Sequence, residues 1–221
     1  MSIMKRKIIL TEDGSSSIYI EEMDEHYHST HGAIQEAKHV FIVNGLGRVK
    51  KDKVKIFELG FGTGLNAFLT LIYGSDKNID YDSIEAFPIE TELIQGLNYI
   101  DEIGEEFESA FKKIHSAKWE IPSDVTNSFQ LRKIHSKIQD YKITKDYYDV
   151  IFFDAFGPRA QSEMWDINVL RDMYNGLMAG GELVTYCAQG QFKRDLKSLG
   201  FEVIPLPGPP GKREMTVGIK K

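Results

Sequence analysis

The sequence predicts an α/β fold, with one doubly wound, mainly parallel sheet of seven strands that ends in an antiparallel edge hairpin. Two observations lead to this prediction. Strand-like and helix-like segments alternate from residue 55 onward, as in consecutive β-α units. The last two strand-like segments are joined directly by the Pro- and Gly-rich residues 207–211. Because no helix lies between them, these two strands must pair antiparallel at one edge of the sheet.

Apolar segments give the strands and their order. Residues 149–153 form a continuous apolar run, which a parallel sheet buries on both faces. The predicted strands are residues 56–59, 81–85, 129–135, 149–153, 182–186, 201–205 and 215–220. Apolar spacing predicts helices at 65–73, from 89 onward with Pro88 in the first turn, and at 101–119, 167–177 and 191–199.

The first 50 residues differ from this pattern. Residues 6–10 and 18–20 flank Asp13-Gly14-Ser15 and predict a hairpin, and residues 32–43 predict a helix. The chain of 221 residues is long enough for one large domain. We therefore expect residues 1–50 to be an N-terminal extension that packs on a main domain of residues 51–221.

Composition narrows the class of protein. A hydrophobic content of 42% with 27% charged residues is ordinary for a soluble globular chain. There is no apolar run of about 18 residues, so no membrane-spanning helix is expected, and the start does not resemble a signal peptide. Cys187 is the single cysteine, which excludes an intrachain disulfide and a thiolate zinc site and favours a cytoplasmic location. No metal site is expected.

The clearest chemical motif is the glycine-rich turn after the first strand of the main domain. Gly60, Gly62 and Gly64 occupy alternate positions between a strand and a helix, where the backbone can approach a ligand closely. Dinucleotide-binding turns place the third glycine three residues after the second, but here it follows after two. Glu58, just before the turn, suits the cationic amino-acid end of S-adenosylmethionine. An isolated glycine triplet could also be a plain tight turn.

A second acid supports the cofactor interpretation. Glu85 ends the next strand, 25 residues after Gly60, where a carboxylate can accept hydrogen bonds from both ribose hydroxyls. A nicotinamide cofactor would share this acid, but the glycine spacing and the closing antiparallel hairpin do not fit it. The sequence therefore predicts a Rossmann-like methyltransferase that binds S-adenosylmethionine.

Asp154 is the candidate catalytic residue. It ends the most apolar strand, and substrate and catalytic groups meet at the carboxyl end of a central parallel strand. An acid there can position an amine nucleophile and take up its proton. The alternative role for Asp154 is to cap the following loop. Phe156, Met164 and Trp165 follow and could hold a flat ring or belong to the core.

Several motifs together make the resemblance to a known family specific. The Asp-Ala-Phe-x-Pro element at 154–158, the downstream Met164-Trp165 and the Gly-Lys-Arg-Glu-Met tail are more specific than the glycine turn. The sequence resembles the methyltransferase domain of the tRNA 5-methylaminomethyl-2-thiouridine biosynthesis protein MnmC and its stand-alone relatives. The matching segments run in order from about residue 10 to the C-terminus: residues 27–29, 32–33, 58–66, 84–88, 152–158, 163–165, 183–186 and 208–215.

This resemblance implies an activity and a set of site residues. The implied reaction converts 5-aminomethyl(-2-thio)uridine at the tRNA wobble position to its methylaminomethyl form with S-adenosylmethionine. Asp154 would face both the methyl group and the substrate amine. The implied cofactor contacts are Glu58, Gly60, Gly62, Gly64, Asn66, Glu85, Asp154 and Tyr27, with residues 27–29 as a lid. The implied substrate contacts are Phe156, Pro158, Lys212 and Arg213, the last two on tRNA.

The sequence departs from the family pattern in two places. The bifunctional protein carries a flavin-dependent domain that has no counterpart here, so we expect no flavin and a separate enzyme that supplies the aminomethyl substrate. The family shows Gly-Asp after the fourth strand, where this chain has Ser136-Lys137 and then Asp140. The contact with the adenine therefore stays open.

Two other function classes compete with the tRNA methyltransferase. The first transfers a methyl or other group to a small amine, which the net charge of −6 would suit. No additional carboxylates are clustered around Asp154 in the sequence, which argues against a polyamine substrate. The second is a Rossmann-like adaptor without turnover, but such a protein has no physical need to retain Glu58, Glu85 and Asp154.

Overall fold

The computed structural model describes residues 5–221 and confirms the α/β class. Its main sheet has the strand order β10-β11-β9-β8-β4-β5-β7-β6. Strands β4, β5, β7, β8 and β9 are parallel, and β11 pairs antiparallel with both β9 and β10, as the direct connection predicts. The strands are β4 (Lys53–Leu59), β5 (Asn78–Glu85), β6 (Ser123–Thr126), β7 (Phe129–His135), β8 (Tyr148–Phe153), β9 (Leu177–Thr185), β10 (Phe201–Pro207) and β11 (Glu214–Lys220).

The prediction of seven strands was wrong by one, because β6 adds an eighth strand at the far edge. This strand has four residues and pairs antiparallel with β7. Val125 is its only buried residue, so the segment shows neither an apolar run nor a clear alternation of apolar and polar residues. Its strand character comes from backbone pairing with β7, which the sequence pattern does not record.

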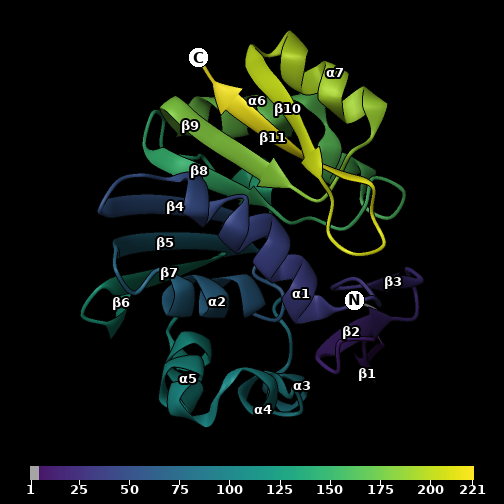
Figure 1. Cartoon of the computed structure of the whole chain (residues 1–221), viewed down its shortest axis with the longest axis vertical. Helices are drawn as coiled ribbons and strands as arrows, with labels where there is room; N and C mark the ends of the chain where they lie inside the picture. The colour runs from purple at the N-terminus through teal and green to yellow at the C-terminus, as the bar shows by residue number, and fades with distance from the viewer. Residues whose placement is uncertain (1–4) are drawn as a thin grey trace.

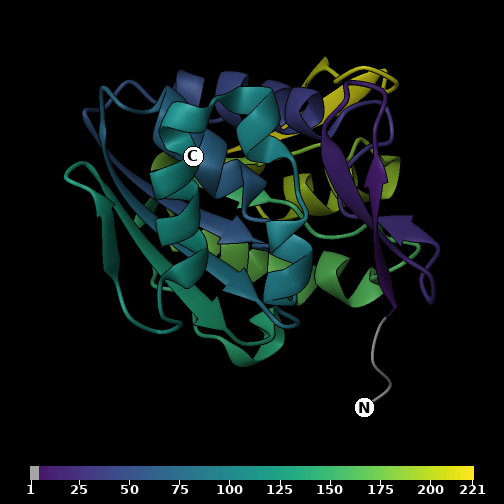
Figure 2. The same cartoon turned by 90° about the horizontal axis from the view of Figure 1, so that it is seen from below.

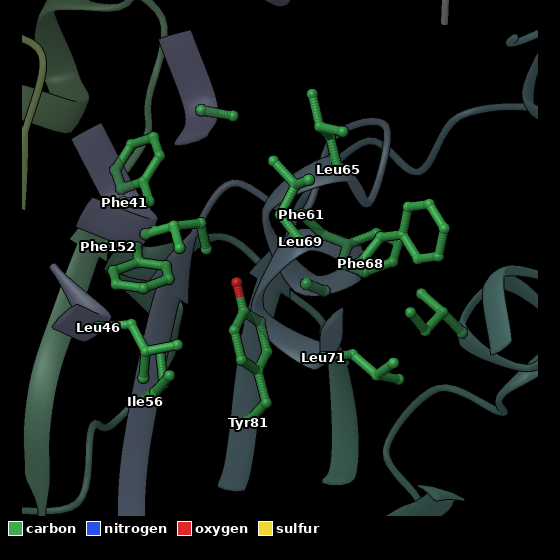
Figure 3. Close-up of a cluster of buried hydrophobic side chains, with 14 of the residues drawn as sticks. Phe41, Leu46, Ile56, Phe61, Leu65, Phe68, Leu69, Leu71, Tyr81 and Phe152 are labelled. Atoms are coloured by element: carbon green, nitrogen blue, oxygen red, sulfur yellow. The ribbon is translucent and has the colours of Figure 1, made fainter. Parts of the chain in front are cut away.

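Helices cover both faces of this sheet (Figures 1 and 2). Alternate residues of β4 point to opposite faces, so Ile56 and Phe57 belong to two separate cores. Figure 3 shows the first core, where Phe68 of α2 (Leu65–Tyr73), Phe152 of β8 and Tyr81 of β5 pack together. The second core lies under α6 (Ile167–Gly176) and α7 (Gly190–Ser198).

The helices between β5 and β6 differ from the prediction. The predicted helix of residues 101–119 is broken into α4 (Tyr99–Ile103), a 3-10 turn (Glu105–Phe107) and α5 (Glu108–Ser116). Gly104 ends α4 with φ +149°, a conformation outside the helical region. Pro88 precedes α3 (Thr91–Gln95) instead of lying in its first turn.

The N-terminal segment forms a small sheet of its own beside the main sheet (Figure 1). Its strands are β1 (Arg6–Leu10), β2 (Ser16–Ile20) and β3 (Glu25–His26), and the hairpin around residues 13–15 is confirmed. The predicted helix that follows consists of α1 (Ala33–Ala37) and the π-helical turn η1 (Lys38–Val43). The division into an extension and a main domain at residue 50 stays a prediction.

One side chain ties this small sheet to the rest of the chain. Asn98 Oδ1 accepts hydrogen bonds from the backbone N–H and the hydroxyl of Ser16, both at 2.7 Å. Asn98 Nδ2 donates to the carbonyl of Gly14 at 2.9 Å. One amide therefore satisfies three polar groups of the hairpin.

Residues 5–221 contain no helix whose length and apolarity would let it cross a membrane. The prediction on the signal peptide rests partly on residues 1–4, which lie outside the described part of the chain.

We expect Asn98→Ala to lower the free energy of unfolding by about 1–3 kcal/mol, because it leaves polar groups of the hairpin without a partner. Urea unfolding followed by circular dichroism measures this change. Asn127→Ala is the matched control, since Asn127 is exposed in the turn after β6. Equal stability of the two variants would show that Asn98 does not hold the N-terminal sheet in place.

Candidate active site

A cavity of about 830 Å³ lies at the carboxyl ends of the parallel strands. Strand pairing creates this position, because Leu59 of β4 is in register with Ile84 of β5 and with Phe153 of β8. The three strands thus end side by side. The cavity is lined by the N-terminal segment (residues 25–31), the glycine turn (60–63), the end of β5 (84–87), residues 136–140, the loop after β8 (154–157) and Gly211-Lys212.

The glycine turn is held against the ends of β5 and β8. Gly60 donates its N–H to the carbonyl of Ile84 at 3.0 Å and has φ +97°. A Cβ atom at Gly60 would lie 2.6 Å from the carbonyl oxygen of Asp154, so any side chain there would push the two strand ends apart. Gly60 and Gly62 line the cavity, but Gly64 does not. Gly64 packs against His115 instead. It therefore does not lie in the cavity wall, where the sequence predicted its contact with the cofactor.

Glu85 lies where the sequence predicted it, at the cavity wall beside the glycine turn. Its Oε2 accepts the N–H of Gly62 at 3.1 Å, and its Oε1 accepts the N–H of Phe87 at 2.8 Å. These two bonds fix the carboxylate in one orientation, and each oxygen still has a lone pair that can accept a further hydrogen bond. Such a carboxylate can bind a pair of ribose hydroxyls.

Asp154 lies in the cavity next to the glycine turn. Its N–H donates to the carbonyl of Leu59 at 3.0 Å, and its Oδ2 accepts a hydrogen bond from Asn66 Nδ2 at 2.7 Å. Burial raises the pKa of Asp154 to about 7, although the bond from Asn66 stabilises the charged form. The carboxyl group therefore exchanges its proton near neutral pH, which suits a group that takes up a proton during a reaction.

Glu58 is not in the cavity wall. It is fully buried in the sheet beneath the glycine turn, where its Oε2 accepts a hydrogen bond from the hydroxyl of Ser83 at 2.6 Å. Burial raises the pKa of Glu58 to about 8, and Asn66 and Tyr81 face the same carboxyl group. The structure thus separates Glu58 from the cavity wall, where the sequence predicted a direct contact with the cofactor.

This acid is part of a buried polar cluster. Oε1 of Glu58, Oδ1 of Asn66 and the hydroxyl of Tyr81 have no hydrogen-bond partner within residues 5–221. Figure 3 shows the Tyr81 hydroxyl as the polar atom among apolar side chains. A protonated Glu58 can donate a hydrogen bond to one of these acceptors, so the raised pKa and the unpaired oxygen atoms agree with each other.

Tyr27 and His28 cover the glycine turn from the N-terminal segment. A Cβ atom at Gly62 would lie 3.1 Å from the Tyr27 ring, and the edge of this ring meets Phe156 with the centroids 4.9 Å apart. His28 Nε2 is 2.8 Å from the hydroxyl of Thr63. Burial lowers the pKa of His28 to about 4, so this contact joins neutral groups at physiological pH. The segment lies over the turn as predicted for a lid, and its lid function stays a prediction.

The predicted substrate residues have different surroundings. Phe156 and Lys212 line the cavity, while Pro158 does not, and Arg213 points to solvent. Lys212 lies against the ring of Tyr186 and pairs with Glu36. Glu36 and Tyr186 were not among the predicted site residues. Glu36 follows the matching segment 32–33 by three residues and Tyr186 ends the segment 183–186, but no spacing rule connects these two regions.

The segment that left the adenine contact open also reaches the cavity. Ser136, Lys137 and Asp140 all belong to its wall, and Ser136 donates its N–H to the carbonyl of Glu85 at the end of β5 at 3.2 Å. Within residues 5–221 no group of three or more His, Cys, Asp or Glu side chains is arranged to hold a metal ion.

Comparisons with known proteins agree with this geometry. A sequence profile described as S-adenosyl-L-methionine-dependent methyltransferase matches residues 99–221, more than half of the chain. The chain belongs to this family of S-adenosyl-L-methionine-dependent methyltransferases. It is an enzyme whose family and fold imply S-adenosylmethionine as the cofactor.

Relatives of this methyltransferase include the bifunctional protein MnmC, named for tRNA 5-methylaminomethyl-2-thiouridine biosynthesis. The protein of Cupriavidus metallidurans is 31% identical over 95% of this chain and 33% of its own length. That of Marinomonas sp. is 30% identical over 94% of this chain and 32% of its own length. The chain thus spans about one third of the length of these relatives.

Solved structures share the fold. MnmC2 from Aquifex aeolicus superposes with a TM-score of 0.81 at 22% identity, over 100% of this chain and 71% of that chain. A putative S-adenosyl-L-methionine-dependent methyltransferase from Methanococcus maripaludis superposes with a TM-score of 0.50 at 13% identity, over 85% of each chain. At these identities the similarity concerns the fold alone.

We expect Glu58→Gln to make the stability of the cofactor-free methyltransferase less dependent on pH. The pKa of Glu58 is about 8 in the folded protein and ordinarily about 4.5, so the unfolded chain loses this proton first. Wild-type stability should therefore fall as the pH rises from about 5 to 8, and the variant should lose less. Urea unfolding at several pH values measures both curves.

Glu105→Gln is the control, because Glu105 is exposed. Its stability curve should run parallel to that of the wild type. If Glu58→Gln also runs parallel to the wild type, Glu58 is ionised in the folded protein at neutral pH.

Proposed function

We propose that this methyltransferase transfers a methyl group to the exocyclic amine of 5-aminomethyl(-2-thio)uridine at the wobble position of tRNA. One observation carries the proposal: Asp154, an acid that titrates near pH 7, faces a cavity at the end of β8 beside the glycine turn. The resemblance to the methyltransferase domain of MnmC supports the choice of substrate. The aminomethyl substrate would come from a separate enzyme.

The residues of the cavity fit S-adenosylmethionine. When bound, this cofactor supplies an electrophilic methyl group on a sulfonium. Gly60 and Gly62 leave the wall of the turn free of side chains, and Glu85 offers a fixed carboxylate for two hydroxyls. Asp154 also lies in the cavity wall, where its carboxylate can attract the cationic end of the cofactor. The ring of Tyr27, which lies over Gly62, would cover the bound cofactor.

Asp154 acts on the substrate amine. The amine must be neutral, because its nitrogen lone pair forms the new bond to the methyl carbon while the bond from that carbon to sulfur breaks. The ionised carboxylate accepts an N–H hydrogen bond, orients the lone pair and takes up the proton that the methylated nitrogen releases. Asn66 holds the carboxylate in place through its 2.7 Å bond to Oδ2. Phe156, which lines the cavity, would pack on the uracil ring of the substrate.

Transfer of labelled methyl groups to two tRNA pools tests the proposal, one pool with the aminomethyl wobble modification and one without it. We expect label in the modified pool alone, recovered as the methylaminomethyl nucleoside. Label in neither pool, from protein that binds the cofactor, would contradict the tRNA substrate.

We expect Asp154→Ala to lower the rate of transfer by about 10²-fold or more, because the general base and its orienting bond are lost. The dissociation constant of the cofactor, measured by calorimetry, should stay within the same order of magnitude. Asp76→Ala is the control, since Asp76 is exposed outside the cavity. Normal turnover by Asp154→Ala would contradict the proposed role.

Two exposed cations near the mouth of the cavity could bind the tRNA backbone. Arg159 lies between the cavity residues Gly157 and Gln161, and Arg213 follows Lys212. Phosphate contacts release counterions, so each lost contact lowers the salt dependence of binding. We propose these two arginines, of which the sequence indicated only Arg213, as tRNA contacts.

For the double variant Arg159→Ala/Arg213→Ala we expect weaker tRNA binding and a slope of log K against log salt that is smaller by about 2. Cofactor affinity should not change. Lys112→Ala/Lys118→Ala, at exposed positions outside the cavity, removes the same charge and is the control. An equal loss of tRNA binding in both double variants would mean that only net charge matters.

A small amine is the second candidate substrate, because the structure brings together carboxylates that are distant in sequence. The cavity wall contains Glu25, Glu36, Glu85, Asp140, Asp154 and Glu163. This group of acids removes the argument that the sequence offered against a polyamine. Spermidine as a third acceptor in the labelling experiment distinguishes the two candidates, since label on spermidine alone would favour this alternative.

A further inference from the structure

Lys212 reaches into the cavity instead of outward to solvent. It lies on the turn between β10 and β11, and its backbone N–H donates to the carbonyl of Pro209 at 2.9 Å. The turn bends toward the N-terminal segment at Gly211, which has φ +80° and contacts His31. The Lys212 ammonium lies 3.9 Å from the centroid of the Tyr186 ring. Its side chain is one third exposed, whereas that of Arg213 points to solvent.

The partner of this ammonium is an acid from the other end of the chain. Lys212 Nζ donates to Glu36 Oε1 at 2.5 Å, and Glu36 Oε2 accepts the N–H of Ser29 at 2.8 Å. The Glu36 side chain is only 9% exposed. A carboxylate so buried needs a charged partner, and Lys212 supplies it. Glu36, Tyr186 and Lys212 all line the cavity that contains Asp154.

We infer that Lys212 and Glu36 are positioning residues for Asp154. The two charges of this ion pair act on Asp154 in opposite directions, and together they set the ionisation of its carboxyl group. The inference rests on the proposed role of Asp154. The pair is built from α1 and the last hairpin, so it forms only when both ends of the chain are folded over the site.

The physical basis is the sign of the two charges. The Lys212 ammonium favours the carboxylate form of Asp154, and the Glu36 carboxylate disfavours it. The pKa of Asp154 follows these directions, since burial raises it first, Glu36 raises it further and Lys212 lowers it. Neither charge is screened as it would be in bulk water, because both line a cavity in the protein. Removal of either charge is therefore expected to change the pKa of Asp154.

The other groups that face Asp154 do not reproduce this effect. Asn66 on α2 donates a neutral hydrogen bond. Glu58 on β4 is influenced by Asp154 but is itself largely protonated at neutral pH, because burial raises its pKa to about 8. The pKa of the Tyr186 hydroxyl after β9 is raised by burial, so this group is neutral and donates to the carbonyl of Ala155 at 2.8 Å. Glu25, Glu85, Asp140 and Glu163 line the same cavity, but Glu36 and Lys212 are the charged groups that shift the pKa of Asp154.

Titration of Asp154 in the cofactor-free protein tests the inference without any enzymatic turnover. Carbon-13 label at the aspartate Cγ allows the carboxyl group to be followed by NMR, and its signal is assigned by its absence from Asp154→Asn. We expect Lys212→Met to raise the pKa of Asp154 by about one pH unit, and Glu36→Gln to lower it by a similar amount. Lys212→Arg keeps the charge and should restore the wild-type titration.

The two variants are expected to shift the pKa of Asp154 in opposite directions, and a folding defect would not produce this result. A disturbed fold would expose Asp154 in both variants and lower its pKa toward the ordinary value in both. Lys193→Met is the matched control, because Lys193 pairs with Glu214 on the same hairpin and lies outside the cavity. It should leave the titration unchanged. An unchanged pKa in Lys212→Met, or a shift of the same sign in both variants, would overturn the inference.

The acid limb of the pH profile of methyl transfer gives the second readout. It should move to higher pH in Lys212→Met and to lower pH in Glu36→Gln, as the ionised Asp154 becomes scarcer or more abundant. If the NMR shifts appear while tRNA receives no methyl group, the ion pair is confirmed and the proposed substrate is wrong. If methyl transfer proceeds while the NMR titrations stay unchanged, the substrate is right and the ion pair has no influence on Asp154.

Discussion

The close approach of two strand ends is the constraint on which the site depends. The carbonyl of Asp154 lies where a side chain on Gly60 would project, and the N–H of Asp154 donates to the carbonyl of Leu59. Only a glycine at the start of the turn allows this approach. The turn and the acid therefore lie side by side because β4 and β8 are parallel neighbours in the sheet. A ligand held by the turn must then lie against Asp154, which brings the cofactor site and the reacting group together.

The second constraint is electrostatic. Glu58 and Asp154 are both removed from water within the same region, and two ionised carboxyl groups there would repel each other. The structure avoids this conflict by keeping Glu58 deeper, with a higher pKa than Asp154. Asn66 lies between them and donates to the group that ionises first. A cationic ligand in the cavity would favour the ionised form of Asp154 further, so cofactor binding and the ionisation of Asp154 are coupled.

Local patterns predicted the parts of the fold and site that lie within a few residues of one another. The glycine turn, Glu85 at the end of its strand and Asp154 at the end of the apolar run follow from spacing and from the geometry of parallel sheets. β6 was missed because four mostly polar residues show no periodicity, and the interrupted helix because Gly104 breaks an otherwise helical pattern. The burial of Glu58 could not be predicted, since alternation along β4 tells which face it occupies but not that α2 covers it.

Lys212 shows why distance along the chain limits prediction from sequence. Beside Arg213 in a turn rich in Pro and Gly, it had the features of a solvated charge or a contact with tRNA. What directs it inward is Glu36, which is 176 residues away in the sequence. The burial of Glu36 depends on the inward course of the turn, because a carboxylate that is 9% exposed needs a charged partner and Lys212 provides it. The chemistry near Asp154 is therefore assembled by tertiary structure, because the ion pair that lines its cavity joins a residue near the N-terminus to one near the C-terminus.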